Sequence, residues 1–133
     1  MNAIPTLSFF EKLYLPESVP CTLEEIIILI RTRRWEAVIT AYRASLAAGD
    51  KEGARKQKGQ LPGFTPSGVF RGGHRANQLE QYSGIVGLDF DHVANPKGLA
   101  ALFCQQACTL ALFVSPGGEG LKVFVRVDPP REA

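Results

Sequence analysis

Two aspartates at alternate positions near the end of an apolar segment are the residues of this chain best suited to chemistry. The segment Ile85 to His92 is typical of a buried β-strand, and Asp89 and Asp91 lie at its exit. Because successive side chains of a strand point to opposite faces, both carboxylates point to the same side. Carboxylate oxygens suit hard cations such as Mg²⁺ or Mn²⁺, which often complete their coordination with water and phosphate oxygens. We therefore predict a divalent metal site here; the alternative is a solvated strand end.

A glycine-rich turn downstream has the composition of a phosphate-binding loop. It runs from Ser115 to Lys122 and joins an apolar run to a run of alternating polar and apolar residues. Its glycines allow backbone N–H groups to converge on an anion, while a hydroxyl and an ammonium group add a donor and a charge. The predicted nucleotide-binding residues are Ser115, Gly117, Gly118, Gly120 and Lys122. The alternative is an ordinary hairpin loop, and the turn is not a Walker loop because the Gly-Lys-Ser/Thr ending is missing.

The elements that must position these two motifs read as strand, helix, strand, hairpin and strand. Asn95 is suited to cap the helix and Pro96 to occupy its first position, and an apolar stripe follows at helical spacing. This order predicts a split βαβ sheet, in which the third strand lies between the other two and is antiparallel to both. Lys122 would then lie beside Asp91. The predicted fold is α+β, with an RRM- or ferredoxin-like sheet after an N-terminal helical segment.

The first third of the chain has mainly helical patterns. Thr22 begins a possible capping box, and an apolar stripe that includes Trp35, Ile39 and Tyr42 lies on one helical face. We expect this stripe to pack in the protein core. The preceding segment Leu7 to Phe10 is expected to add an edge strand.

A polar, glycine-containing segment lies between these helices and the acidic strand. Within it, Arg71, His74 and Arg75 are candidates for contact with a nucleotide or a nucleic-acid backbone. The alternative is a surface loop.

The acidic strand, the helix after it and the Ser-x-Gly-Gly-x-Gly-Leu-Lys turn resemble the first two motifs of archaeo-eukaryotic-type primases and primase-polymerases. The resemblance is strongest to the primase-like N-terminal domain of virulence-associated E-type proteins of mobile elements. The further segments that carry the resemblance are Leu7–Phe10, Thr22–Ile26, Lys58 with Leu61–Pro62, Thr65–Phe70 and Tyr82–Ile85. The resemblance implies that Asp89 and Asp91 are catalytic metal ligands. It also implies a role in DNA replication, with an associated helicase-like region or protein.

The sequence departs from that family in two places. Lys122 stands where primase-polymerases usually have a histidine, and no third acidic motif is identifiable. Our leading interpretation is a metal-dependent nucleotide-binding domain that uses Mg²⁺ or Mn²⁺, with nucleotidyl transfer as the implied reaction and DNA as the favoured nucleic acid. The alternatives are a non-catalytic module that binds nucleotide or nucleic acid for a replication protein, and a purely structural interaction domain.

Composition limits these interpretations without choosing among them. With 133 residues, 45% of them hydrophobic, the chain can bury one modest core, so we expect a single domain over residues 1–133, either whole or the N-terminal part of a longer protein. The formal net charge of +2 gives no strong basic field for nucleic acid. Three cysteines without metal-site spacing indicate a reduced, cytoplasmic setting. No apolar stretch is long enough to cross a bilayer, so no membrane partner is expected.

Overall fold

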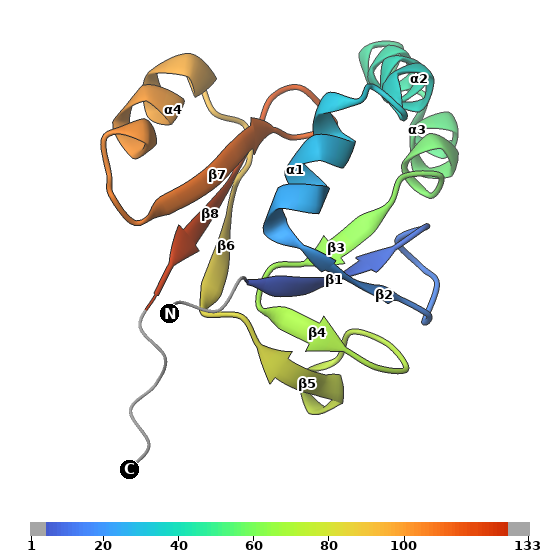
Figure 1. Cartoon of the computed structure of the whole chain (residues 1–133). Coiled ribbons are helices and arrows are strands. Elements are labelled where there is room, and N and C mark those ends of the chain that lie inside the picture. Colours follow the sequence, from blue (N-terminus) through green and yellow to red (C-terminus); the bar gives the residue numbers. More distant parts are fainter. Residues whose placement is uncertain (1–4, 128–133) are drawn as a thin grey trace.

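The computed structural model of the protein describes residues 5–127, and within them four α-helices and eight β-strands form the predicted α+β fold (Figure 1). The helices are α1 (Leu23–Arg31), α2 (Glu36–Ala47), α3 (Lys51–Lys58) and α4 (Pro96–Cys104), with a short 3₁₀ helix at Ala76–Gln78. The strands are β1 (Thr6–Phe10), β2 (Val19–Thr22), β3 (Gly63–Thr65), β4 (Gly68–Phe70), β5 (Leu79–Tyr82), β6 (Ile85–Phe90), β7 (Thr109–Val114) and β8 (Leu121–Arg126).

The C-terminal half of the described chain forms a three-stranded sheet in the order β6-β8-β7. Strand β8 is antiparallel to both neighbours, so the third strand lies in the middle, as expected from the sequence. The described strands are divided among three small antiparallel sheets, however, and they do not form the single larger sheet of an RRM- or ferredoxin-like domain. The prediction is therefore confirmed at the level of the α+β class and of this strand order.

Helix α4 covers one face of the β6-β8-β7 sheet. Asn95 caps the helix as predicted, because its Oδ1 accepts a hydrogen bond from the N–H of Gly98 at 3.1 Å. The ring of Phe103 lies 5.5 Å from that of Phe90 on β6, measured between centroids. On β8, Val123 is fully buried, as its place in the alternating pattern predicts.

The other face of this sheet contributes to the main core beneath α1. Ile85 and Phe124 are almost fully buried there, together with Leu7 from β1 and Ile26 from α1. Figure 1 shows α1 lying between this sheet and the strands of the N-terminal half. The core therefore joins the two halves of the chain through side chains that are far apart in the sequence.

Strand β1 is the central strand of a second sheet, ordered β2-β1-β3, so the prediction of an edge strand was wrong. Its side chains from Leu7 to Phe10 are all buried, and a strand with both edges paired is the arrangement that protects such a segment best. The hydroxyl of buried Ser8 also accepts a hydrogen bond from the N–H of Phe70 at 2.8 Å, which ties β1 to β4.

Helices α1 and α2 differ in what they bury. Helix α1 begins at the predicted capping box, where Thr22 Oγ1 accepts from the N–H of Glu25 at 3.2 Å, and it buries Leu23 and Ile26. Helix α2 has no buried residue, so the prediction that its apolar stripe packs in the core was wrong. No helix within residues 5–127 has the length and apolar character needed to cross a bilayer.

Candidate functional site

Rows of residues cross the sheet on the face opposite α4. Directly opposed residues of an antiparallel pair share a face, so one row contains Asp89 on β6, Lys122 on β8 and Phe113 on β7. The next row contains Gly87 and Phe124, and it leads into the core. This face of the sheet is therefore polar at the C-terminal end of β6, around Asp89, and apolar two residues before it, around Gly87.

The ammonium group of Lys122 forms an ion pair with Asp89, with Nζ 2.9 Å from Oδ2. The sequence placed Lys122 beside Asp91, and the structure corrects this pairing by two residues. The reason is the register between β6 and β8, because β8 begins with Leu121 opposite Phe90. Asp91 follows the strand, on the same side as Asp89 and one step closer to the glycine-rich turn.

The glycine-rich turn uses most of its polar groups to hold its own shape. The N–H of Gly118 donates to the carbonyl of Ser115 at 2.9 Å, and the N–H of Gly120 donates to the Ser115 hydroxyl oxygen at 3.0 Å. Gly117 differs, because its N–H has no hydrogen-bond partner in the part of the chain that the structure describes. The Glu119 N–H likewise has no partner within residues 5–127, so the donors of the turn that are free for a ligand are the N–H groups of Gly117 and Glu119 and the Ser115 hydroxyl proton.

Close packing requires glycine at one position of this turn. A Cβ atom on Gly120 would lie 2.7 Å from the carbonyl oxygen of Phe90 on the neighbouring strand, which is closer than real contacts allow. The turn is thus pressed against the end of β6, immediately before Asp91. In this structure Gly120 brings the two predicted motifs together, and it is not itself exposed to a ligand.

Arg43 on α2 attaches that helix to the glycine-rich turn. Its Nε–H donates to the carbonyl of Pro116 at 2.9 Å, and its guanidinium lies against Gly118. Sequence reasoning missed this residue. Its position four residues after Ile39 places it on the apolar stripe of α2, and a cation on such a stripe is a signal that could have identified it.

A groove of about 800 Å³ runs between the β6-β8-β7 sheet and helices α1 and α2. Five of the predicted metal- and nucleotide-binding residues line it, namely Asp89, Asp91, Ser115, Gly117 and Lys122. Residues that the sequence did not assign to a site also line it, among them Arg33, Ile39, Tyr42, Arg43, Lys58 and Phe113. The groove therefore combines carboxylates, several cations and an apolar surface.

The donor set of the groove is incomplete for a metal bound by protein alone. Within residues 5–127 no group of three or more His, Cys, Asp and Glu side chains is arranged to hold a metal ion. Asp89 and Asp91 can supply two ligands, and a cation such as Mg²⁺ commonly takes the rest from water and phosphate oxygens. The residues present therefore fit a cation that arrives with a phosphorylated ligand.

The predicted nucleic-acid contacts lie away from this groove. Arg71 forms an ion pair with Glu80 at 3.1 Å, and the ring of His74 packs against that of Phe10. Neither residue lines the groove, nor does Arg75. Figure 1 shows strands β4 and β5 at the opposite end of the molecule from the turn between β7 and β8. The structure does not bring these three residues to the predicted nucleotide site.

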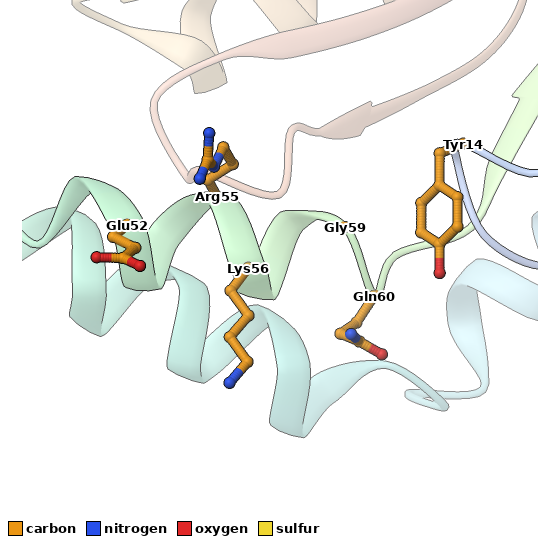
Figure 2. Close-up of a pocket in the computed structure, with 6 residues that line it drawn as sticks. All are labelled: Tyr14, Glu52, Arg55, Lys56, Gly59 and Gln60. Atoms are coloured by element: carbon orange, nitrogen blue, oxygen red, sulfur yellow. The ribbon is translucent and has the colours of Figure 1, made fainter.

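A second hollow, of about 330 Å³, lies along α3 and contains none of the predicted site residues. Figure 2 shows Lys56 and Gln60 extending from one side of the helix, Tyr14 beyond its C-terminal end, and Arg55 directed to the other side. Side chains that diverge in this way do not converge on a ligand.

Comparison with known families matches residues 56–133 to the family described as BT4734-like, N-terminal domain. The chain belongs to this family. The match covers more than half of the chain and includes both the acidic strand and the glycine-rich turn. No curated protein and no solved structure matches the chain.

This family is not the virulence-associated E-type domain that the motifs resemble, so the assignment to primase-polymerases was wrong. The predicted roles in DNA replication and mobile elements depended on that assignment, so they lose their support. The motifs themselves are short, and two acids on a strand followed by a glycine-rich turn recur in unrelated folds. Function is therefore to be inferred from the set of carboxylates, cations and apolar side chains that line the groove.

Proposed function

We propose that the groove binds a nucleoside triphosphate together with a divalent cation, Mg²⁺ or Mn²⁺. The observation that supports this most is the register of β6 and β8, which sets Lys122 against Asp89 in the groove that Ser115 and Asp91 also line. Metal ligands and phosphate ligands are adjacent in such an arrangement, as a metal–triphosphate complex requires.

Each group has a distinct part in this proposal. Asp89 and Asp91 bind the cation, which bridges to phosphate oxygens. Lys122 exchanges its ion pair with Asp89 for a contact with phosphate, and the Ser115 hydroxyl and the Gly117 N–H donate hydrogen bonds to the same anion. Charge-assisted hydrogen bonds of this kind are about twice as strong as neutral ones.

The test is calorimetric titration of the protein with MnCl₂, and then with ATP in the presence of saturating Mn²⁺. The double variant Asp89→Asn, Asp91→Asn should lose Mn²⁺ binding and Mn²⁺-dependent ATP binding while it keeps its circular dichroism spectrum. A matched control is Glu17→Gln, which removes an exposed carboxylate elsewhere and should leave both affinities unchanged. ATP binding by a folded double variant at the parent affinity would refute the proposal.

The bound nucleotide can either undergo nucleotidyl transfer or stay chemically unchanged, and the second is the second candidate function. It is favoured by the small donor set, because no group of three or more metal-ligating side chains is found within residues 5–127. Chromatography of ATP after incubation with the protein and Mn²⁺ distinguishes the two, since only conversion yields a product.

The nucleic-acid role of Arg71, His74 and Arg75 and a cytoplasmic location also remain proposals. The first is supported by the exposure of these side chains. The second is supported by the three cysteines, which are all free.

A further inference from the structure

The side of the groove formed by α2 is more apolar than metal and phosphate binding requires. Ile39 and Tyr42 of this helix line the groove, and so does Phe113 on the sheet. Phe113 packs against Phe64 of β3 with ring centroids 6.1 Å apart, and both rings remain partly exposed. None of these side chains is fully buried, so each of them leaves apolar surface exposed in the groove.

The apolar part is next to the cationic part. Phe113 lies directly across from Lys122 on the neighbouring strand, and adjacent strands are about 4.8 Å apart. A ligand whose phosphate contacts Lys122 can therefore reach the ring of Phe113 with another of its groups. A flat ring on that ligand would meet aromatic surface below and the aliphatic and aromatic side chains of α2 beside it.

The size of the groove also indicates a ligand larger than phosphate. About 800 Å³ falls within the roughly 300–1,000 Å³ typical of small-molecule sites, whereas a metal–triphosphate group alone would leave the apolar part empty. Several cations line the groove, Arg33, Arg43, Lys58 and Lys122, and they suit a ligand that carries negative charge.

We infer that the apolar half of the groove, formed by Ile39, Tyr42, Phe113 and Phe64, binds the base of the nucleotide. This inference rests on the proposed function. Stacking of a base on an aromatic ring contributes about 1–3 kcal/mol, which corresponds to a factor of about 5–150 in affinity. Arg43 fixes the position of α2 against the glycine-rich turn and so sets the distance between the two halves.

The experiment compares ATP with inorganic tripolyphosphate in saturating MnCl₂, by calorimetry on the full chain. We expect ATP to bind at least about fivefold more tightly. Equal affinities would overturn the inference and leave standing only the metal and triphosphate part of the proposed function. Absence of binding by both would overturn the proposed function itself, and the inference with it.

Two variants locate the base. Ile39→Ala should weaken ATP binding by about tenfold and leave tripolyphosphate binding unchanged. Phe113→Leu, which keeps most of the apolar volume but removes the aromatic face, should also act on ATP alone. The control is Val38→Ala, a similar truncation on α2 at a position outside the groove lining, which should change neither affinity. If Ile39→Ala and Phe113→Leu both retain the parent preference for ATP, the base is not held here.

A third probe separates a free nucleotide from a nucleic-acid strand, which offers the same bases and phosphates. A single-stranded oligodeoxynucleotide without a 5′-triphosphate should bind more weakly than ATP and should fail to displace it. Displacement of ATP by the oligonucleotide at lower concentration would assign the groove to a strand and would overturn the inference.

Discussion

Replacement of Lys122 by methionine should have opposite effects on the two ligands of the proposed site. Methionine keeps the unbranched apolar stem and removes the charge. In the structure the Lys122 ammonium lies 2.9 Å from an Asp89 carboxylate oxygen, so it competes with a metal ion for that carboxylate. Its removal should release Asp89 for Mn²⁺ and at the same time take away a cation that binds phosphate.

The magnitudes follow from the exposure of the pair. The two side chains are 33% and 55% exposed, and an ion pair so accessible to water contributes about 0.2–1 kcal/mol. Lys122→Met should therefore bind Mn²⁺ alone about 1.4 to 5 times more tightly, and the free energy of unfolding should fall by no more than about 1 kcal/mol. A hydrogen bond to a charged group contributes about 1.5–3 kcal/mol, so ATP affinity at saturating Mn²⁺ should fall by about tenfold to a hundredfold.

The assay is calorimetric titration with Mn²⁺ alone and then with ATP, accompanied by urea denaturation. Lys97→Met is the matched control, because Lys97 is exposed on α4 and that helix covers the other face of the sheet. Weaker Mn²⁺ binding by a folded Lys122→Met variant would show that Lys122 supports the metal site and does not compete with it. Unchanged ATP affinity would remove Lys122 from the phosphate site.

Three further predictions test the parts of the structure that support the groove. Gly120→Ala would place a Cβ atom 2.7 Å from a backbone carbonyl oxygen of β6, so it should lower the urea midpoint and ATP affinity, whereas Gly59→Ala, whose nearest contacts are at 3.5 Å, should be tolerated. Ser8→Ala leaves the buried N–H of Phe70 without its partner at 2.8 Å and should cost about 1–3 kcal/mol of unfolding free energy in urea; a loss below a few tenths would mean that water replaces the hydroxyl. Burial raises the pKa of the Cys21 thiol, which lowers its thiolate fraction, so iodoacetamide at pH 8 should label it more slowly than the two exposed cysteines in mass-spectrometric time courses; equal rates would contradict this.

Local patterns predicted the elements well where neighbouring residues determine the structure. The cap at Asn95 and the capping box at Thr22 are both confirmed, because each needs only a side chain and a backbone N–H three residues later. The alternation along β8 likewise predicted that Leu121 and Val123 are buried. These features depend on interactions within a few residues, which the sequence displays directly.

Features that depend on distant residues were predicted less well. Whether Leu7–Phe10 forms an edge or a central strand depends on its pairing with β3, and nothing in the segment itself specifies that partner. The partner of Lys122 depends on the register between β6 and β8, where a shift of two residues exchanges Asp91 for Asp89 without changing which face is polar. The sequence could thus predict the composition of the site but not its exact pairings.

The stripe on α2 shows a different difficulty, because an apolar helical face looks the same in sequence whether it lines a core or a groove. Ile39 and Tyr42 follow the same periodicity as core residues, and only the position of α2 over the glycine-rich turn makes them part of a groove. Arg43 is the exception on that stripe, since a cation is costly in a core unless it has partners. A charged residue in phase with an apolar stripe is therefore the kind of signal that separates the two cases.

The two sides of the groove come from different segments of the chain. Its floor, with Asp89, Lys122 and the glycine-rich turn, lies within the segment that matches the BT4734-like family, whereas the α1 and α2 wall precedes that segment. If the two proposals hold, substitutions of Asp89, of Lys122 or in the glycine-rich turn should change affinity for metal and phosphate with any nucleotide. Substitutions in the α2 wall, like Phe113→Leu on the sheet, should instead change the discrimination between ATP and tripolyphosphate. Affinity and discrimination would then be set by separate groups of side chains, and the hydrogen bond from Arg43 to the carbonyl of Pro116 joins α2 to the glycine-rich turn.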